Sequence, residues 1–91
     1  MQKLNITFVA MLKKIESKGG WTYLVWPKSA SYFETKGLIK VRGTMDGHKF
    51  VSSFMAMGGG VHMLPVKAEL RVLLNKEAGK RVNVHLTERI G

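Results

Sequence analysis

Residues 58–67 read GGGVHMLPVK and form the junction around which the rest of the chain is organised. The three glycines can adopt positive φ angles, so they predict a loop before the short apolar run. Pro65 fits the first turn of a helix, where its missing N–H costs nothing. Beyond it, apolar residues recur at helical spacing: Val66, Leu70, Leu73 and Leu74. The stretch therefore predicts a loop, a strand and a helix that begins at Pro65.

Alternating apolar and polar residues on either side of this junction predict further strands. We expect these strands at residues 4–12, 21–26, 38–45, 48–57 and 81–90. Asp46-Gly47 predicts a two-residue type I′ hairpin between the third and the fourth of them. Residues 28–36 predict a short helix that ends at Gly37.

For two of these strands the sequence predicts which side chains point toward the core and which point outward. Residues 21–26 carry apolar side chains on both faces, which predicts a central strand covered on both sides. In the last strand the residues expected to point inward are Val82, Val84 and Leu86. Those expected to point outward are Arg81, His85 and Arg89.

Two segments of the chain share the order strand, proline, helix, glycine, strand. One contains Pro27 and Gly37, and the other contains Pro65 and Gly79. Two such units with two further strands would be enough to close a small barrel of about six strands. The repeat reflects either pseudo-twofold symmetry or the common use of proline and glycine at helix ends.

Composition limits the class of protein. The chain of 91 residues fits one domain, residues 1–91, and its 45% hydrophobic content is enough for a core. Without cysteine it has no disulfides and no thiolate sites. Since no apolar run approaches the roughly 18 residues of a membrane span, we expect a cytoplasmic protein that does not bind membranes. The net charge of +9 either attracts polyanions such as nucleic acid or keeps the protein dispersed.

An ordered set of short motifs covers nearly the whole chain. It runs through Trp21-Thr-Tyr-x-Val25-x-Pro27, Lys40-Val-Arg-Gly-Thr-x-Asp46-Gly47, Ser53-Phe-Met55, His62-x-Leu64-Pro65-Val66 and Gly79-x-x-Val82-x-Val84. In these motifs the chain resembles the bacterial and archaeal domain-of-unknown-function family nineteen-oh-five. The resemblance implies a compact β-barrel with short helices, in some groupings a double-split barrel, and it implies no activity. The fold class expected is therefore all-β, mainly β with two short helices, in a small closed or double-split β-barrel.

The sequence favours no catalytic, metal or cofactor site. The six acidic residues include no closely spaced pair of the kind used in acid–base catalysis. None of His48, His62 and His85 has a ligand at the spacing of a metal site, and neither a nucleophile elbow nor a phosphate-binding loop motif is present. We therefore expect a protein that is not an enzyme and needs no cofactor.

The leading prediction of function is a non-enzymatic binding or interaction module, active as a monomer or a homodimer, for a small-molecule or protein ligand. The glycine loop either cradles an anion through backbone N–H groups or is only a flexible link. The aromatic cluster of Trp21, Tyr23 and Trp26 either stacks on bases or belongs to the core, with one of the two tryptophans at a rim. His62 is either near a pocket or a polar residue on the outer face of its strand. The candidate binding residues are Trp21, Tyr23, Arg42, Gly58, Gly59, Gly60, His62 and Lys67.

The alternative prediction is a β-barrel that binds DNA or single-stranded nucleic acid. Basic side chains beside aromatic ones can contact phosphates while bases stack on the rings. If the strands that carry them are neighbours, the basic face would consist of Lys28, Lys40, Arg42, Arg81 and Arg89.

Overall fold

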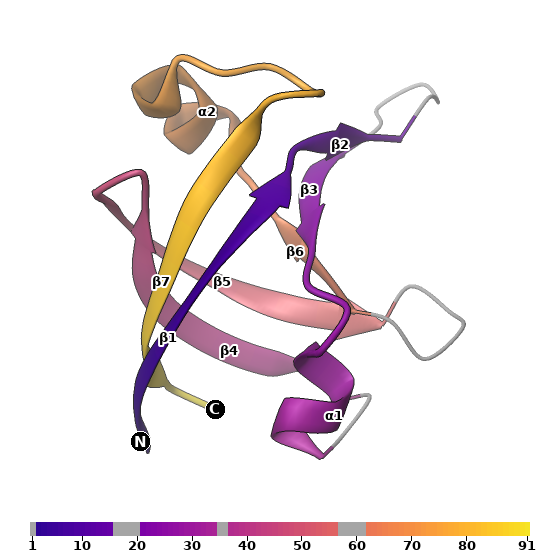
Figure 1. Cartoon of the computed structure of the whole chain (residues 1–91), viewed down its shortest axis with the longest axis vertical. Helices are drawn as coiled ribbons and strands as arrows, with labels where there is room; N and C mark the ends of the chain where they lie inside the picture. The colour runs from indigo at the N-terminus through magenta and orange to yellow at the C-terminus, as the bar shows by residue number, and fades with distance from the viewer. Residues whose placement is uncertain (1, 16–20, 35–36, 57–61) are drawn as a thin grey trace.

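The computed structural model describes residues 2–15, 21–34, 37–56 and 62–91 (Figure 1). The glycine loop at residues 58–60 lies outside the described residues, so the predictions about it are not addressed. In chain order the elements are β1 (Gln2–Met11), β2 (Lys13–Lys14), β3 (Thr22–Val25), α1 (Ser29–Phe33), β4 (Ile39–Met45), β5 (His48–Ala56), β6 (His62–Pro65), α2 (Ala68–Leu74) and β7 (Arg81–Arg89).

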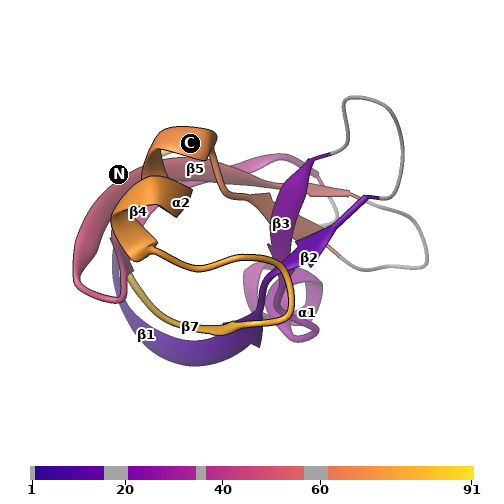
Figure 2. The ribbon, with the colours of Figure 1, turned by 90° about the horizontal axis from the view of Figure 1, so that it is seen from above.

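The strands form one antiparallel sheet in the order β1-β7-β4-β5-β6-β3-β2. The sheet curls into a half-barrel around the core, as Figure 2 shows from above. The expectation of a mainly β fold with two short helices is confirmed, but the sheet has seven strands rather than about six. The extra strand is β2, which only Leu12 separates from β1. The Leu12 N–H donates to the Lys80 oxygen, and the Leu12 oxygen accepts from the Gly79 N–H.

The predicted hairpin between β4 and β5 is confirmed. The two strands pair from Ile39↔Phe54 to Met45↔His48, which leaves a two-residue turn. Asp46 and Gly47 have φ angles of 49° and 85°, and positive φ at both positions is the requirement of a type I′ turn. The hairpin therefore forms where the sequence places it.

The outward position predicted for Arg89 is wrong because β7 contains a bulge. Arg42 of β4 pairs with Glu88, and Gly43 pairs with Leu86, so Thr87 has no partner in β4. One unpaired residue shifts the alternation, so each side chain beyond it lies on the opposite face from the one predicted. Arg89 therefore shares the inner side with its partner Val41, and its Cζ atom lies 5.7 Å from the centre of the Phe33 ring. This geometry allows a cation–π contact.

The helix that follows the opening stretch begins later than predicted. Pro65 is the last residue of β6 and not part of a helix, and α2 begins at Ala68. The predicted apolar stripe is also narrower, since Leu70 and Leu74 are buried but Leu73 is exposed. The helix predicted at residues 28–36 is also shorter than expected. Glu34 adopts the left-handed conformation and ends α1 before Gly37.

The core contains apolar side chains from the sheet and from both helices, with Phe54, Ile39 and Leu64 fully buried. Trp26 packs against this core and stacks on Phe8 at 4.9 Å between ring centres. The prediction that β3 is covered on both sides is wrong. Thr22 and Leu24 are buried on its inner face, whereas Tyr23 and Val25 on its other face are only half-buried.

The internal repeat corresponds to two units that pair with each other. β3, α1 and β4 form one unit, and β6, α2 and β7 form the other. β3 pairs antiparallel with β6, and β4 pairs antiparallel with β7. The two helices lie at opposite ends of the sheet (Figure 1). This arrangement agrees with an approximate twofold relation between the units. Neither helix in the described part of the chain is long enough or apolar enough to cross a membrane.

Candidate functional site

His62 lies in the interior and not on an outer face. Its side chain is fully buried, and its ring forms two hydrogen bonds. Because a carbonyl oxygen can only accept, Nε2–H donates to the Gly37 oxygen at 3.1 Å. Nδ1 lies 2.9 Å from the hydroxyl oxygen of Ser29, and in the neutral ring it accepts from that hydroxyl. His62 therefore connects the start of β6 to α1 and to the segment before β4, which is a structural role.

The ladder between β5 and β6 ends early, and the reason is Pro65. The strands pair only at Met55↔Met63 and Ala56↔His62. The Val66 N–H donates to the backbone oxygen of Thr22 in β3. Because main-chain groups alternate in direction along a strand, those of Pro65 face β5. Proline has no N–H with which to continue the ladder. The Ser52 hydroxyl donates instead to the Pro65 oxygen at 3.0 Å.

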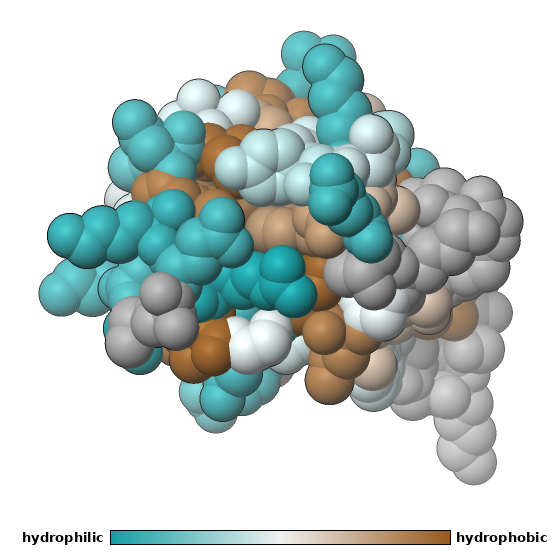
Figure 3. All heavy atoms as spheres, turned by 90° about the horizontal axis from the view of Figure 1, so that it is seen from below, coloured by the Kyte–Doolittle hydropathy of each residue, from teal (hydrophilic) through white to brown (hydrophobic). Residues whose placement is uncertain are grey.

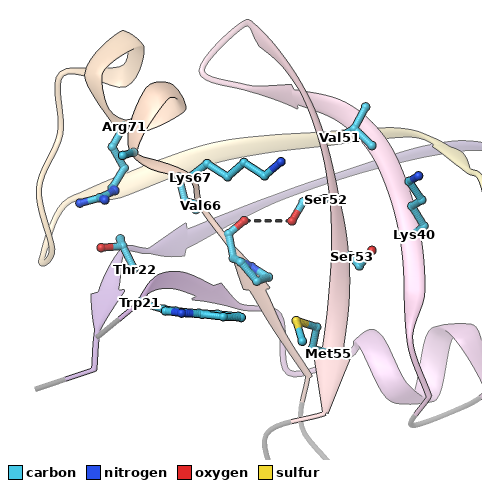
Figure 4. A pocket seen from close by; sticks show the side chains of 12 residues that line it. Trp21, Thr22, Lys40, Val51, Ser52, Ser53, Met55, Val66, Lys67 and Arg71 are labelled. Carbon is cyan, nitrogen blue, oxygen red and sulfur yellow. Dashed lines mark hydrogen bonds between the residues drawn. The ribbon is translucent and has the colours of Figure 1, made fainter. Parts of the chain in front are cut away.

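A pocket of about 590 Å³ lies where β5 and β6 separate. This volume is in the range of small-molecule sites, which is about 300–1,000 Å³. Figure 4 shows its side chains: Trp21 and Met55 lie on one side, and Lys67 and Arg71 extend from the start and middle of the α2 segment on the other. Ser52, Ser53 and Thr22 supply hydroxyl groups, and Val51, Pro65 and Val66 supply apolar surface.

The pocket is electrostatically positive. Among the described residues that line it, three are basic (Lys40, Lys67 and Arg71) and none is acidic. The ion pairs of the described residues are Arg42–Glu88 and Lys76–Asp46, so they involve none of the three. The buried Nε of Arg71 has no hydrogen-bond partner among the described residues. The charges of Lys40, Lys67 and Arg71 would therefore favour an anion in the pocket.

The described residues show no arrangement typical of metal binding, since they contain no group of three His, Asp or Glu side chains around one point. The chemistry that the pocket offers is binding through charge, hydroxyl groups and apolar contact. Elsewhere, on the face shown in Figure 3, apolar side chains lie in patches between hydrophilic ones.

Comparison with known families assigns the chain. A model of the family described as domain of unknown function DUF1905 matches residues 8–86. The chain belongs to the DUF1905 family. Among curated proteins, none matches the chain. The matched range contains all twelve residues that line the pocket of this DUF1905 domain.

In this DUF1905 domain the pocket contains two of the predicted binding residues, Trp21 and Lys67. Tyr23 pairs with Pro65 but does not line the pocket. Arg42 lies on the outer face and forms an ion pair with Glu88 at 3.2 Å between Nη1 and Oε1. The predicted cluster of Trp21, Tyr23 and Arg42 is therefore only partly brought together.

The predicted nucleic-acid face of the DUF1905 domain is dispersed. Lys40 and Arg42 share the outer face of β4, as expected. Arg81 and Arg89 lie at the two ends of β7, about 26 Å apart along the strand at 3.3 Å per residue. Arg89 also faces the interior side, and Lys28 lies beside α1 at the far end of the sheet from α2 (Figure 1).

Sequence reasoning missed Arg71, Ser52 and Met55 as pocket residues. A signal for Arg71 was available, because it follows Lys67 by four residues and therefore lies on the same side of the helix. Ser52 and Met55 had no comparable signal, since they line a pocket only because the neighbouring strand separates from β5.

Proposed function

We propose that the protein is a non-enzymatic binding module whose pocket between β5 and β6 takes a small anionic ligand. One observation carries this proposal: the described residues that line the pocket include three basic side chains and no carboxylate. Opposite charges attract strongly where water is partly excluded, and arginine and lysine are the usual partners of phosphate and carboxylate groups.

The finer architecture that we propose for this module is a closed barrel. β1 and β2 are the two ends of the sheet, and only Leu12 separates them along the chain. A continuous strand that pairs with β7 at one end and with β3 at the other would hold the curled sheet in a fixed shape. Such a scaffold would keep the pocket residues in place before a ligand arrives.

Calorimetric titration with small anions at low salt tests the binding function. We expect phosphate- or carboxylate-containing compounds to bind, and the affinity to fall as salt is added. Substitution of Lys67 or Arg71 by glutamine should weaken binding roughly tenfold each, equal to about 1.4 kcal/mol. Lys28→Gln is the matched control because it removes the same charge outside the pocket. If Lys28→Gln weakens binding as much as Lys67→Gln, only the net charge matters and the proposal fails.

Nucleic-acid binding is the alternative that we propose for the same basic surface. The net charge of +9 and the outward Lys40 and Arg42 support it, whereas the positions of Arg81 and Arg89 do not. Labelled single-stranded and double-stranded DNA would show binding as a rise in fluorescence anisotropy that decreases with salt. No change at low salt would exclude this alternative.

A further inference from the structure

The two tryptophans of the chain differ in their surroundings. Trp26 lies within 6.2 Å of four aromatic rings, those of Phe8, Tyr32, Phe33 and Phe54, measured between ring centres. Trp21 contacts no other aromatic ring among the described residues, and its side chain is 48% exposed at the pocket. Trp26 is therefore part of the core, while the large apolar face of Trp21 is available to a ligand.

The basic groups lie across the pocket from this indole. The Arg71 N–H donates to the Lys67 carbonyl at 3.0 Å, so the two residues are one helical turn apart on the same side of α2. In Figure 4 their side chains lie above the indole of Trp21, which is seen nearly edge-on and extends toward Met55. An anionic group and an aromatic ring could thus occupy the two sides of one pocket at the same time.

The apolar part of the pocket indicates more than a bare anion. Met55, Pro65 and Val51 line it together with Trp21. Inorganic phosphate would leave these surfaces exposed to water and would gain nothing from them. A ligand with a planar ring could stack on the indole and cover them, and stacking of a base on an aromatic side chain contributes about 1–3 kcal/mol.

From these observations we propose that the ligand is a nucleoside phosphate, whose base stacks on Trp21 while its phosphate contacts Lys67 and Arg71. The planar guanidinium of Arg71, which lines the pocket, suits phosphate oxygens. The hydroxyl of Ser53 lines the pocket and is available to the sugar. This inference rests on the proposed function, because it requires an anion in the same pocket.

Titration of the whole protein with five probes tests it: adenosine monophosphate, guanosine monophosphate, adenosine, ribose phosphate and inorganic phosphate. We expect the two nucleotides to bind at least tenfold more tightly than any probe that lacks either the base or the phosphate. Trp21→Ala should weaken nucleotide binding at least tenfold, and Trp21→Phe should retain most of it because phenylalanine keeps a ring. Thermal unfolding of both variants checks that substitution at this exposed position leaves the fold intact.

The outcomes separate the two proposals. If ribose phosphate binds as tightly as adenosine monophosphate and Trp21→Ala changes nothing, the nucleotide assignment is overturned while the anion site stands. If no anion binds and Lys67→Gln has no effect, both proposals are overturned. A thymidine oligonucleotide is included as a sixth probe. Binding that strengthens with its length, with no response to free nucleotides, would overturn the nucleoside phosphate in favour of a polynucleotide.

Discussion

The hydroxyl of Ser52 donates a hydrogen bond of 3.0 Å to the carbonyl oxygen of Pro65 at the point where β5 and β6 separate. Proline lacks the N–H that would continue the backbone ladder, but its carbonyl oxygen still accepts, and here it accepts from a side chain. The contact connects the two strands and leaves space on the outer side of the sheet. The pocket therefore depends on Pro65 as a strand residue.

Removal of this contact should loosen the connection between the strands. Ser52→Ala deletes the donor and leaves the Pro65 oxygen without it, so we expect the free energy of unfolding to fall by about 1 kcal/mol. Ser53→Ala is the matched control, because the neighbouring hydroxyl also lines the pocket but forms no hydrogen bond within the described residues. Urea denaturation of both variants measures the difference, and equal stabilities would contradict the bridging role of Ser52.

Replacing Pro65 by a residue with a backbone N–H should lengthen the hydrogen-bonded ladder between β5 and β6. Pro65→Ala introduces an N–H directed at β5, so we expect β5 and β6 to pair over more of their length and the pocket to narrow. Hydrogen exchange followed by NMR would show a protected amide at position 65. Rapid exchange at that amide would mean that the strands are separated by something other than the proline.

The features that sequence predicted correctly are local. Asp46-Gly47 specifies its turn through the φ angles of two adjacent residues, whatever the rest of the chain does. The facing of β4 also follows from its own alternation, with Ile39 and Val41 buried. Such patterns need no knowledge of the neighbouring strands.

The features that sequence missed depend on contacts between distant segments. Arg89 turns inward because a bulge at Thr87 inverts the facing of β7, and the bulge exists only relative to β4. His62 is buried because Ser29 and Gly37 supply partners 33 and 25 residues away. In both cases the composition of the strand itself carries no corresponding signal.

The buried position of His62 makes it important for stability. His62→Ala would leave a cavity and would remove the hydrogen bonds of its ring to Ser29 and Gly37, so we expect a loss of about 2–4 kcal/mol in the free energy of unfolding. His48→Ala is the control, because His48 is only half-buried and forms no side-chain hydrogen bond within the described residues. A loss below 1 kcal/mol for His62→Ala would show that the buried network contributes little.

Gly43 allows β4 and β7 to approach closely beside the bulge. A Cβ atom at this position would lie 2.0 Å from the backbone oxygen of His85, which a strand cannot accommodate without moving. We expect Gly43→Ala to lower stability by about 1–3 kcal/mol, the usual cost of overpacking. Thermal denaturation compares it with Gly91→Ala, where an added Cβ meets nothing within 4 Å and no change is expected. Similar melting temperatures for both variants would contradict the close approach.

Asp46 connects the hairpin turn to the segment after α2 and to β7. Its carboxylate lies 2.6 Å from the Nζ of Lys76 and accepts a hydrogen bond of 2.9 Å from the Asn83 N–H. Partial burial alone would raise the pKa of Asp46, but the hydrogen bond from Lys76, the Asn83 N–H and the charge of Lys76 together lower this pKa below its ordinary value of 3.8. The ionised form is therefore the one that the folded state favours.

A carboxyl group with a lowered pKa in the folded state makes folding stability depend on pH in one direction. The stabilisation is fully present above the unfolded pKa of 3.8 and is lost as pH falls through the lower pKa of the folded state. Asp46→Asn keeps the turn conformation but cannot ionise, so it should be less stable than the unmodified protein at neutral pH. The difference should shrink below pH 3.8. Urea denaturation at several pH values measures this difference, and a gap that stays constant into acid would show that the charge of Asp46 does not stabilise the fold.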